Sequence, residues 1–157
     1  MTEFDLRSLL AMLHEHEVEF VVIGGVAVGA HGFIRGTEDL DIVPDPDADN
    51  LKRLASALSD LKATLPTAGD RAFLPAGDFG VIRRGGNVTA ATMFGGLDVV
   101  QRAQGVPSYS QLTEDAVESE LLGIPVRVCS LARLREMKSA QDRTQDRLDL
   151  ENLPEPE

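Results

Sequence analysis

Two aspartates one residue apart, Asp39 and Asp41, are the best candidates for chemistry in this chain. They open the segment 39–43, in which acidic and apolar residues alternate as in a half-buried strand. Residues i and i+2 of a strand point to the same side, so both carboxylates face one way while Leu40 and Ile42 point into a core. Two like charges about 6–7 Å apart repel each other unless a cation lies between them. The spacing therefore predicts a divalent metal ion.

A glycine pair, Gly24–Gly25, precedes these acids at the end of the apolar run 20–23, and residues 26–31 have the pattern of a short helix. A strand-to-helix turn without side chains lets phosphate oxygens approach backbone N–H groups, and a helix N-terminus favours the anion. Each feature alone has a plainer explanation, a tight turn for the glycines and a solvated strand face for the acids. Their succession predicts a metal beside a phosphate-binding turn.

A third carboxylate, Asp98, is flanked by apolar residues in the strand-like segment 97–101. The preceding segment 87–94 is also strand-like, and Gly95–Gly96 marks a turn or bulge between the two. On its own, Asp98 is best explained as an edge-strand aspartate. Together with the earlier pair it could form a triad holding two Mg²⁺ ions through oxygen ligands, with positions left for a triphosphate and water. Mn²⁺ would suit the same ligands.

The segments 22–27 and 35–42 resemble the signature of nucleotidyltransferases of the DNA polymerase β superfamily. That signature is a hydrophobic residue, Gly, Gly or Ser, a gap, Asp-hydrophobic-acid, and a later Asp on a strand. The gap here, residues 26–38, is at the long end. The chain is most similar to the small stand-alone bacterial members, a group that includes the AbiEii-like toxin nucleotidyltransferases. The resemblance covers about residues 18–153 and implies an α/β (α+β) fold, a central mixed sheet flanked by helices with a C-terminal hairpin and helices.

The resemblance also implies roles for individual residues. It makes Asp39, Asp41 and Asp98 the metal ligands and catalytic residues. The implied nucleotide-binding residues are Gly24, Gly25, Arg35, Thr37, Lys138 and Asp146. From the residues alone, Arg35 and Thr37 could equally shape and cap a loop, and Lys138 could be a solvated helix residue. Asp149 could be an exposed neighbour of Asp146.

The mechanism implied is transfer of a nucleoside monophosphate from an NTP to an acceptor hydroxyl. Asp39 and Asp41 would bind the ion that bridges the triphosphate, and Asp41 and Asp98 the second ion, with Asp98 as general base. The acceptor stays open among a tRNA 3′ end, a protein hydroxyl and a small molecule such as an aminoglycoside. A toxin role with an antitoxin partner is one reading. A nucleotide-binding regulatory or antitoxin module without catalysis is an alternative from a different class.

The net charge of the chain restricts the kinds of molecule that it is expected to bind. The 157 residues contain 15 Lys and Arg against 26 Asp and Glu, a net charge of −11, with one Tyr and no Trp. A polymerase-like grip on long nucleic acid is disfavoured, because such a grip needs a basic face. Recognition of one RNA end by a local patch stays compatible, because net charge does not describe a local field. The single Cys129, the acidic N-terminus and the absence of a bilayer-spanning apolar run predict a cytoplasmic protein without membrane contact.

One domain is expected over residues 1–153, which the resemblance implies is a nucleotidyltransferase domain, with an acidic tail over 154–157. Helices are expected at 4–16, 25–32, 51–62, 131–141 and 143–152, and a helical or loop stretch from residue 108. Strands are expected at 18–23, 38–43, 72–75, 79–84, 88–94 and 96–102, the last three as a meander beside 38–43. Segments 117–121 and 124–129 are expected to form a hairpin that turns at Gly123.

Overall fold

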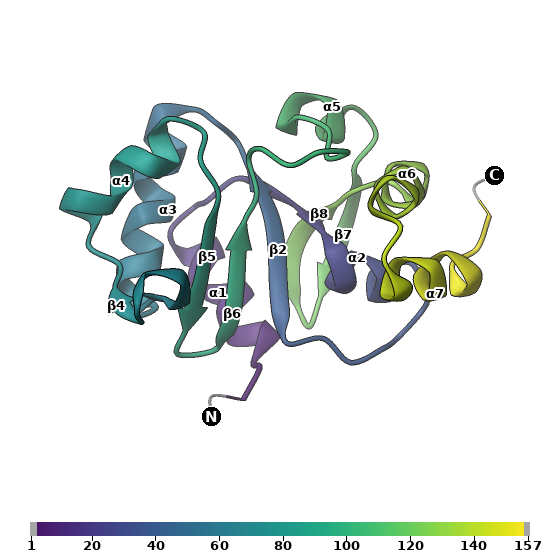
Figure 1. Ribbon diagram of the computed structural model, residues 1–157, viewed down its shortest axis with the longest axis horizontal. Helices are drawn as coiled ribbons and strands as arrows, with labels where there is room; N and C mark the ends of the chain where they lie inside the picture. Colours follow the sequence, from purple (N-terminus) through teal and green to yellow (C-terminus); the bar gives the residue numbers. More distant parts are fainter. Residues whose placement is uncertain (1–2, 156–157) are drawn as a thin grey trace.

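The computed structural model describes residues 3–155, which form an eight-stranded mixed sheet with helices on both faces (Figure 1). The strand order is β4-β3-β5-β6-β2-β1-β8-β7. The strands are β1 Phe20–Ile23, β2 Asp39–Pro44, β3 Thr64–Leu65, β4 Arg71–Ala72, β5 Val88–Thr92, β6 Gly95–Val99, β7 Val117–Leu121 and β8 Ile124–Val128. The helices are α1 Leu6–Glu15, α2 Gly24–Ala30, α3 Ala48–Asp60, α4 Pro75–Arg83, α5 Tyr109–Glu114, α6 Leu131–Gln141 and α7 Thr144–Asn152, with a 3-10 turn at Pro66–Ala68.

The centre of the sheet combines antiparallel and parallel pairs. Strand β1 pairs antiparallel with β2 and parallel with β8, while β2 pairs parallel with β6. Strands β5 and β6 form an antiparallel hairpin, as do β7 and β8. All four residues of β1 are buried, as expected for a strand covered on both faces. The mixed α/β sheet predicted from the sequence is confirmed.

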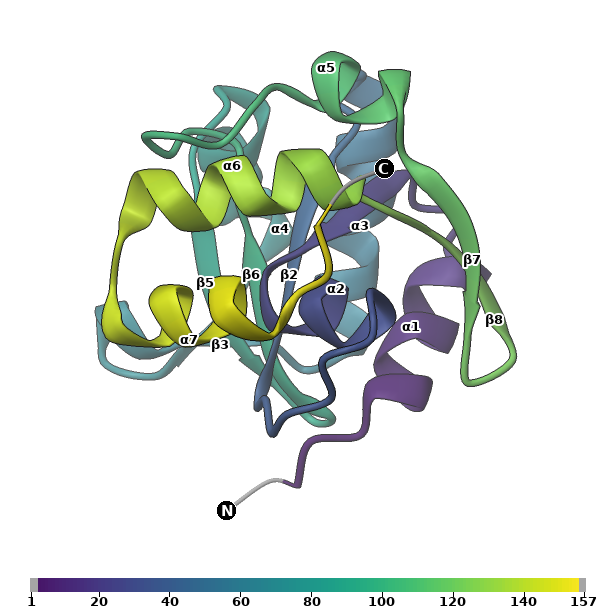
Figure 2. The ribbon, with the colours of Figure 1, turned by 90° about the vertical axis from the view of Figure 1, so that its right-hand side faces the viewer.

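Different helices cover the two faces of the sheet. Figure 2 shows α2, α6 and α7 on one side and α1 and α3 on the other. Helices α1 and α3 bury continuous leucine stripes: Leu9, Leu10, Leu13, Leu51, Leu54 and Leu58 are all at most 2% exposed. Burial of such side chains contributes about 1.5–3 kcal/mol each. Helix α7 differs, because the residues it buries are two aspartates.

Helix α4 is where the sequence-based prediction was wrong. Residues 79–84 were expected to form a strand, but 75–83 are helical. Pro75 occupies the first turn, and the Asp78 carboxylate accepts the Leu74 backbone N–H at 2.8 Å. Proline at a helix start and an acid in the first turn both stabilise the N-terminus, which outweighs the β-like run Phe79–Ile82.

The other strands lie close to their predicted positions, with two changes. The expected strand at 72–75 is the two-residue β4, which pairs with an unpredicted two-residue strand, β3. The meander is reduced to the β5–β6 hairpin, of which β6 lies beside β2. Of the expected acidic tail, residues 156–157 lie outside the described residues, as do residues 1–2. Among the described helices, none has the length and apolarity needed to cross a membrane.

Candidate active site

Three acids line up on neighbouring strands at the middle of the sheet. Asp41 of β2 lies directly opposite Asp98 of β6 in the parallel register, and Asp39 lies opposite Gly96. Residues in register on adjacent strands, and residues two apart on one strand, share a face. The fold therefore places Asp39, Asp41 and Asp98 on one face, as the spacing of the first two residues predicted.

Two glycines make room for these carboxylates. Gly24 begins α2 with a φ of +70°, and a Cβ built on it would collide with the Asp41 carboxylate. A Cβ on Gly96 would likewise collide with the Asp39 carboxylate. Gly24 is thus required twice, for its left-handed backbone and for its missing side chain. The glycine turn lies directly against an acid of the site.

The acids are held in a setting that disfavours their charged forms. Burial, a hydrogen bond with Asp98 and repulsion by Asp98 and Asp39 together raise the pKa of Asp41 to about 7, while Lys138 opposes the shift. Burial also raises the pKa of Asp98, which Asp39 raises further and the hydrogen bonds from Asp41 and Thr89 moderate. Carboxylates that repel each other in a partly desolvated site are the groups that a cation would relieve.

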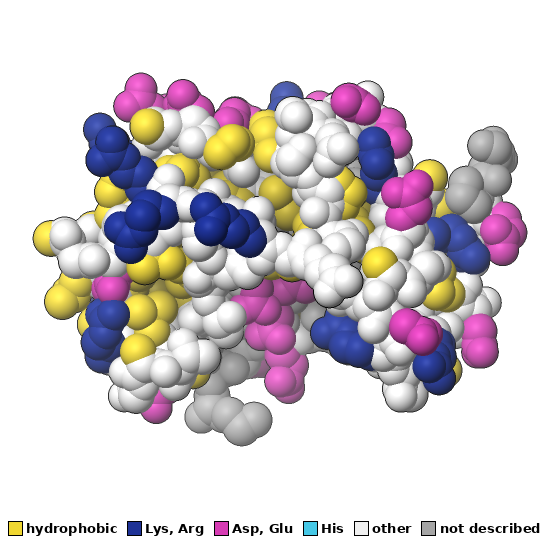
Figure 3. All heavy atoms as spheres, turned by 45° about the horizontal axis from the view of Figure 1, so that its top comes forward, with side chains coloured by type: hydrophobic (Ala, Val, Ile, Leu, Met, Phe, Trp, Pro, Cys, Tyr) yellow, Lys and Arg dark blue, Asp and Glu magenta, His cyan; other side chains and the backbone are white. Residues whose placement is uncertain are grey.

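A cavity of about 190 Å³ opens beside this pair, between the sheet and α6. Asp41 and Asp98 line one side, and Lys138 and Arg143 contribute cationic groups. The remaining lining residues are Ile23, Gly24, Val100, Ala103, Val106, Leu134, Met137 and Gln141. Acids facing cations across a small cavity suit a ligand that carries both metal and phosphate. In Figure 3, acidic side chains are visible in the middle of the face, with basic side chains to either side of them.

Lys138 is fixed by two buried acids from α7. Its Nζ lies 3.1 Å from Asp146 Oδ1 and 3.1 Å from Asp149 Oδ2, and the three side chains are at most 8% exposed. Asp149 also accepts both Nε (2.8 Å) and Nη2 (3.0 Å) of Arg35, from the loop between α2 and β2. Asp149 therefore links the loop that leads into β2 to the lysine that lines the cavity.

Arg143 completes this network from the start of α7. Its Nε donates to Asp146 Oδ2 at 2.8 Å, and its backbone N–H donates to the same oxygen at 3.1 Å. Burial alone would raise the pKa of Asp146, but the hydrogen bonds from Arg143 and Lys138 outweigh it and lower the pKa. The pKa of Asp149 is lowered in the same way by Arg35, Gln145 and Lys138. Both acids thus stay ionised, as partners that hold cations at the cavity.

Solved structures share this architecture. A Thermotoga maritima protein provisionally assigned as a nucleotidyltransferase matches with a TM-score of 0.58 at 14% identity, over 93% of this chain and 88% of that chain. ANT(2″)-Ia in complex with adenylyl-2″-tobramycin matches with a TM-score of 0.57 at 13% identity, over 93% and 83%. The chain has the nucleotidyltransferase fold. No protein-family model matches the sequence, and no curated protein matches it.

Within the nucleotidyltransferase fold, the predicted nucleotide-binding residues divide into two groups. Gly24 and Lys138 line the cavity. Arg35 and Thr37 instead lie over Gly25, where an added Cβ would come within 3.1–3.2 Å of their side-chain nitrogen and oxygen atoms. Thr37 Oγ1 also donates to the Asp39 backbone carbonyl at 3.2 Å. The two side chains therefore brace the turn ahead of β2.

Sequence reasoning missed two residues of this site. Asp149 was offered as an exposed residue, yet it is fully buried and binds two cations. Arg143 was given no role in the predicted site, yet it lines the cavity. The available signal was that α7 lacks an apolar stripe: Asp146 and Asp149, three apart, occupy its buried face.

The acids suit Mg²⁺ or Mn²⁺ by their chemistry, although not as one tight cluster. Among the residues described, no group of three or more His, Cys, Asp or Glu side chains is close enough to hold a metal together. The close pair is Asp41 and Asp98, and Asp39 lies two residues away from Asp41 along β2. Mg²⁺ is commonly held by one or two carboxylates, with substrate phosphates and waters completing the shell. The pair fits that mode of binding.

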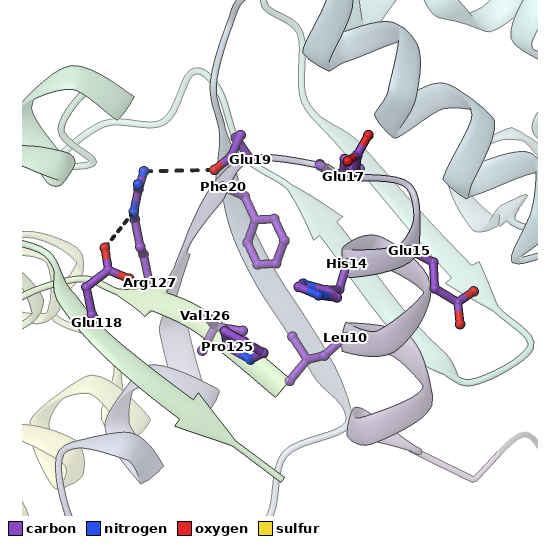
Figure 4. Close-up of a pocket in the computed structure, with 11 residues that line it drawn as sticks. Leu10, His14, Glu15, Glu17, Glu19, Phe20, Glu118, Pro125, Val126 and Arg127 are labelled. Carbon is purple, nitrogen blue, oxygen red and sulfur yellow. Dashed lines mark hydrogen bonds and ion pairs between the residues drawn. The ribbon is translucent and has the colours of Figure 1, made fainter. Parts of the chain in front are cut away.

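A second cavity, of about 540 Å³, lies between α1 and β8, away from these acids (Figure 4). Its charged rim includes Arg127, whose Nε lies 2.9 Å from Glu118 Oε1 and whose Nη1 lies 3.9 Å from Glu19 Oε2. The other charged and ionisable lining residues are His14, Glu15 and Glu17. None of the three site acids lines this cavity, so the smaller one is the candidate active site.

Proposed function

We propose that this chain is a divalent-metal-dependent nucleotidyltransferase that moves a nucleoside monophosphate from an NTP to an acceptor hydroxyl. The observation that carries the proposal is the in-register pair Asp41–Asp98 beside a cavity lined by Lys138 and Arg143. The nucleotidyltransferase fold supports it. A plain structural role would not require two like charges to face each other in a partly buried site, because such pairs destabilise a fold.

Asp41 and Asp98 would hold the metal, and Asp39 lies near enough to raise the pKa of both. When bound, a divalent ion neutralises charge on phosphate oxygens and acidifies a hydroxyl. The raised pKa of Asp41 gives the site a reason to take up a cation, since binding replaces like-charge repulsion with attraction.

The chain's own groups would bind and orient the reactants. The Lys138 ammonium group has three N–H donors, and two of them face Asp146 and Asp149. The third N–H donor can bind a phosphate oxygen. Arg143 would bind the triphosphate from the same wall, and Gly24 lets the phosphates approach the backbone. The acceptor oxygen bonds to the α-phosphorus as the bond to pyrophosphate breaks, and Asp98 accepts the hydroxyl proton.

The test is pyrophosphate release from labelled ATP, CTP, GTP and UTP, each with Mg²⁺, with Mn²⁺ and with EDTA. Total RNA, total protein and aminoglycosides serve as acceptors, the last because ANT(2″)-Ia was solved with adenylyl-2″-tobramycin. We expect metal-dependent transfer that is lost in Asp41→Asn and Asp98→Asn. Asp70→Asn is the matched control, because Asp70 is exposed and has a φ of +61°, which Asn adopts readily. Full activity in Asp41→Asn would overturn the mechanism.

The same experiment separates the non-catalytic alternative. A regulatory or antitoxin module would bind nucleotide, measured by isothermal titration, without releasing pyrophosphate or labelling any acceptor. A toxin role adds a cellular expectation, that induced expression arrests growth while induced Asp41→Asn does not. Restoration of growth by co-expression of a protein encoded beside this one would then identify the antitoxin.

A further inference from the structure

Three exposed arginines, Arg83, Arg84 and Arg102, form what we call the arginine patch. Arg83 and Arg84 end α4, and Arg102 follows β6. Among the residues described, none of the three has an ion-pair partner, whereas the arginines of α6 and α7 are all paired with acids. Acids outnumber bases 26 to 15 in this chain, so three exposed arginines without an ion-pair partner on two neighbouring segments form a locally basic surface.

The patch is held in place by hydrogen bonds between the two segments. Arg102 Nη2 donates to the Arg84 carbonyl at 2.5 Å. Asn87 Oδ1 accepts the backbone N–H groups of Gln101 at 2.7 Å and Arg102 at 2.9 Å. The Gln101 side chain donates to the Ile82 carbonyl at 2.9 Å. The guanidinium groups are therefore presented from an ordered edge, which lowers the entropy lost on binding an anion.

The patch lies beside the candidate active site. Arg102 comes four residues after Asp98, so the chain between them spans at most about 14 Å. The intervening Val100 and the following Ala103 both line the cavity that holds Asp98. Figure 3 shows basic side chains on the α4 side of the face whose middle carries acidic side chains. A ligand seated in the cavity could reach the patch with a short extension.

We propose that the arginine patch binds backbone phosphates of a single-stranded RNA whose 3′-terminal hydroxyl is the acceptor at Asp98. This inference rests on the proposed function and names its acceptor. A stacked strand rises about 3.4 Å per nucleotide, so about 14 Å corresponds to roughly four nucleotides. Arginine recognises phosphate in a bidentate manner, whereas a cationic aminoglycoside would be repelled.

The contact with the RNA would be to its phosphates and not to its bases. A single Tyr and no Trp leave few side chains on which bases could stack, so the contact would go to the sugar–phosphate chain. In the reaction, the 3′-oxygen bonds to the α-phosphorus of the NTP, the bond to the pyrophosphate oxygen breaks, and the hydroxyl proton passes to Asp98.

The test is fluorescence anisotropy with a 5′-labelled single-stranded RNA of roughly 12 nucleotides and no NTP, at salt from about 50 to about 200 mM. Three phosphate contacts predict a slope of log K against log salt of about −2, which is about 15-fold weaker binding across that range. In Arg83→Gln/Arg84→Gln/Arg102→Gln the slope falls close to zero and binding at low salt weakens at least about tenfold.

The matched control is Arg7→Gln/Lys62→Gln/Arg127→Gln, which removes the same charge outside the patch and should leave the slope unchanged. Circular dichroism checks that both triple variants are folded. Equal losses in the two triple variants would overturn the proposal, as would a wild-type slope near zero. Single-stranded DNA or polyglutamate binding as tightly as the RNA would overturn the assignment to RNA.

Failure here is distinguishable from failure of the proposed function, because binding is measured without nucleotide. RNA binding through the patch by a chain that releases no pyrophosphate would overturn only the enzymatic proposal. Transfer to a small molecule by a chain that does not bind RNA would overturn only this inference.

Discussion

Asp41 and Asp98 face each other across the parallel pair β2–β6, in register and on one side of the sheet. Two carboxyl groups in this position destabilise the empty protein, and the pKa of Asp41 rises to about 7 mainly because of burial, with the hydrogen bond and repulsion from Asp98 adding to it. Local destabilisation of this kind is typical of functional sites, because a bound ligand can compensate for the lost folding stability. The first prediction follows from this pair.

Asp41→Asn should stabilise the metal-free protein near neutral pH. Because the pKa is raised from 3.8 to about 7, the folded state binds more protons than the unfolded state between these values, and stability falls as pH rises through that window. Asn does not ionise, so the variant should gain on the order of 1–2 kcal/mol at pH 8, or roughly 3–6 °C in Tm. The gain should vanish below about pH 4.

Thermal melts in EDTA from pH 4 to pH 8 measure this difference, with Asp70→Asn as the control for a lost surface charge. Added Mg²⁺ should raise the Tm of the wild-type protein and leave Asp41→Asn unchanged. A wild-type and variant pair with parallel curves at every pH would contradict the proposed repulsion.

Gly24→Ala should cost both stability and activity. The residue would have to adopt a φ of +70° and would drive its Cβ into the Asp41 carboxylate. The left-handed backbone alone costs about 1 kcal/mol, and displacement of Asp41 adds to it. Gly29→Ala is the control in the same helix, since nothing lies within 4 Å of the added Cβ and alanine favours helix by up to about 1 kcal/mol. Urea unfolding of both variants decides the matter; equal stability would argue against the close fit at Gly24.

Asp149→Asn should weaken the link between Arg35 and Lys138. Removing one charge from a buried network costs about 3 kcal/mol, and we expect kcat/KM to fall roughly 10–100-fold as Lys138 loses its position. Asp142→Asn is the control: it breaks the pair with Arg147, in which both side chains are more than 60% exposed, and should leave the stability close to that of the wild type. A double-mutant cycle with Arg35→Gln should show coupling, and strict additivity would contradict a shared contact.

Asp78→Asn should remove part of the resistance of α4 to acid. Hydrogen bonds from Arg71 and the Leu74 backbone lower the pKa of Asp78 to about 2. The ionised carboxylate therefore stabilises the fold above about pH 4, and this stability is lost as pH falls toward 2. The variant should be about 1 kcal/mol less stable at pH 7, a value reduced by the 51% exposure of Arg71, and equal to the wild type near pH 2. Urea melts at the two pH values test this, and an equal deficit at both would exclude the charge as the cause.

Cys129 should be unreactive in the folded protein. Burial is the largest of the effects that raise the pKa of its thiol to about 12, and the side chain is fully buried. Because the thiolate is the reactive form, alkylation by iodoacetamide should be slow at pH 8 and should become fast in denaturant. Mass spectrometry of the modified fraction measures both rates; rapid labelling without denaturant would mean that this strand end opens.

Local patterns predicted most of the fold. The leucine spacing of α1 and α3, the alternation in β2 and the turn at Gly123 each depend on residues within a few positions, and the structure confirms these elements. The strand predicted at 79–84 failed because Pro75 and Asp78, which stabilise a helix start, outweighed a short apolar run that suits either structure. The mixed order of the strands is set by long-range pairing, which periodicity does not report.

For the site, the sequence alone was enough to identify the chemical groups: a glycine turn, two acids on one strand face and a third acid on a later strand. Their meeting depended on β6 pairing parallel with β2, since a shift of one residue would turn Asp98 to the other face. The buried position of Asp149 could not be predicted from the sequence, because it also depends on long-range packing. Its partner Arg35 is 114 residues away, and whether an acid on a helix faces water or two buried cations is determined by what packs against it.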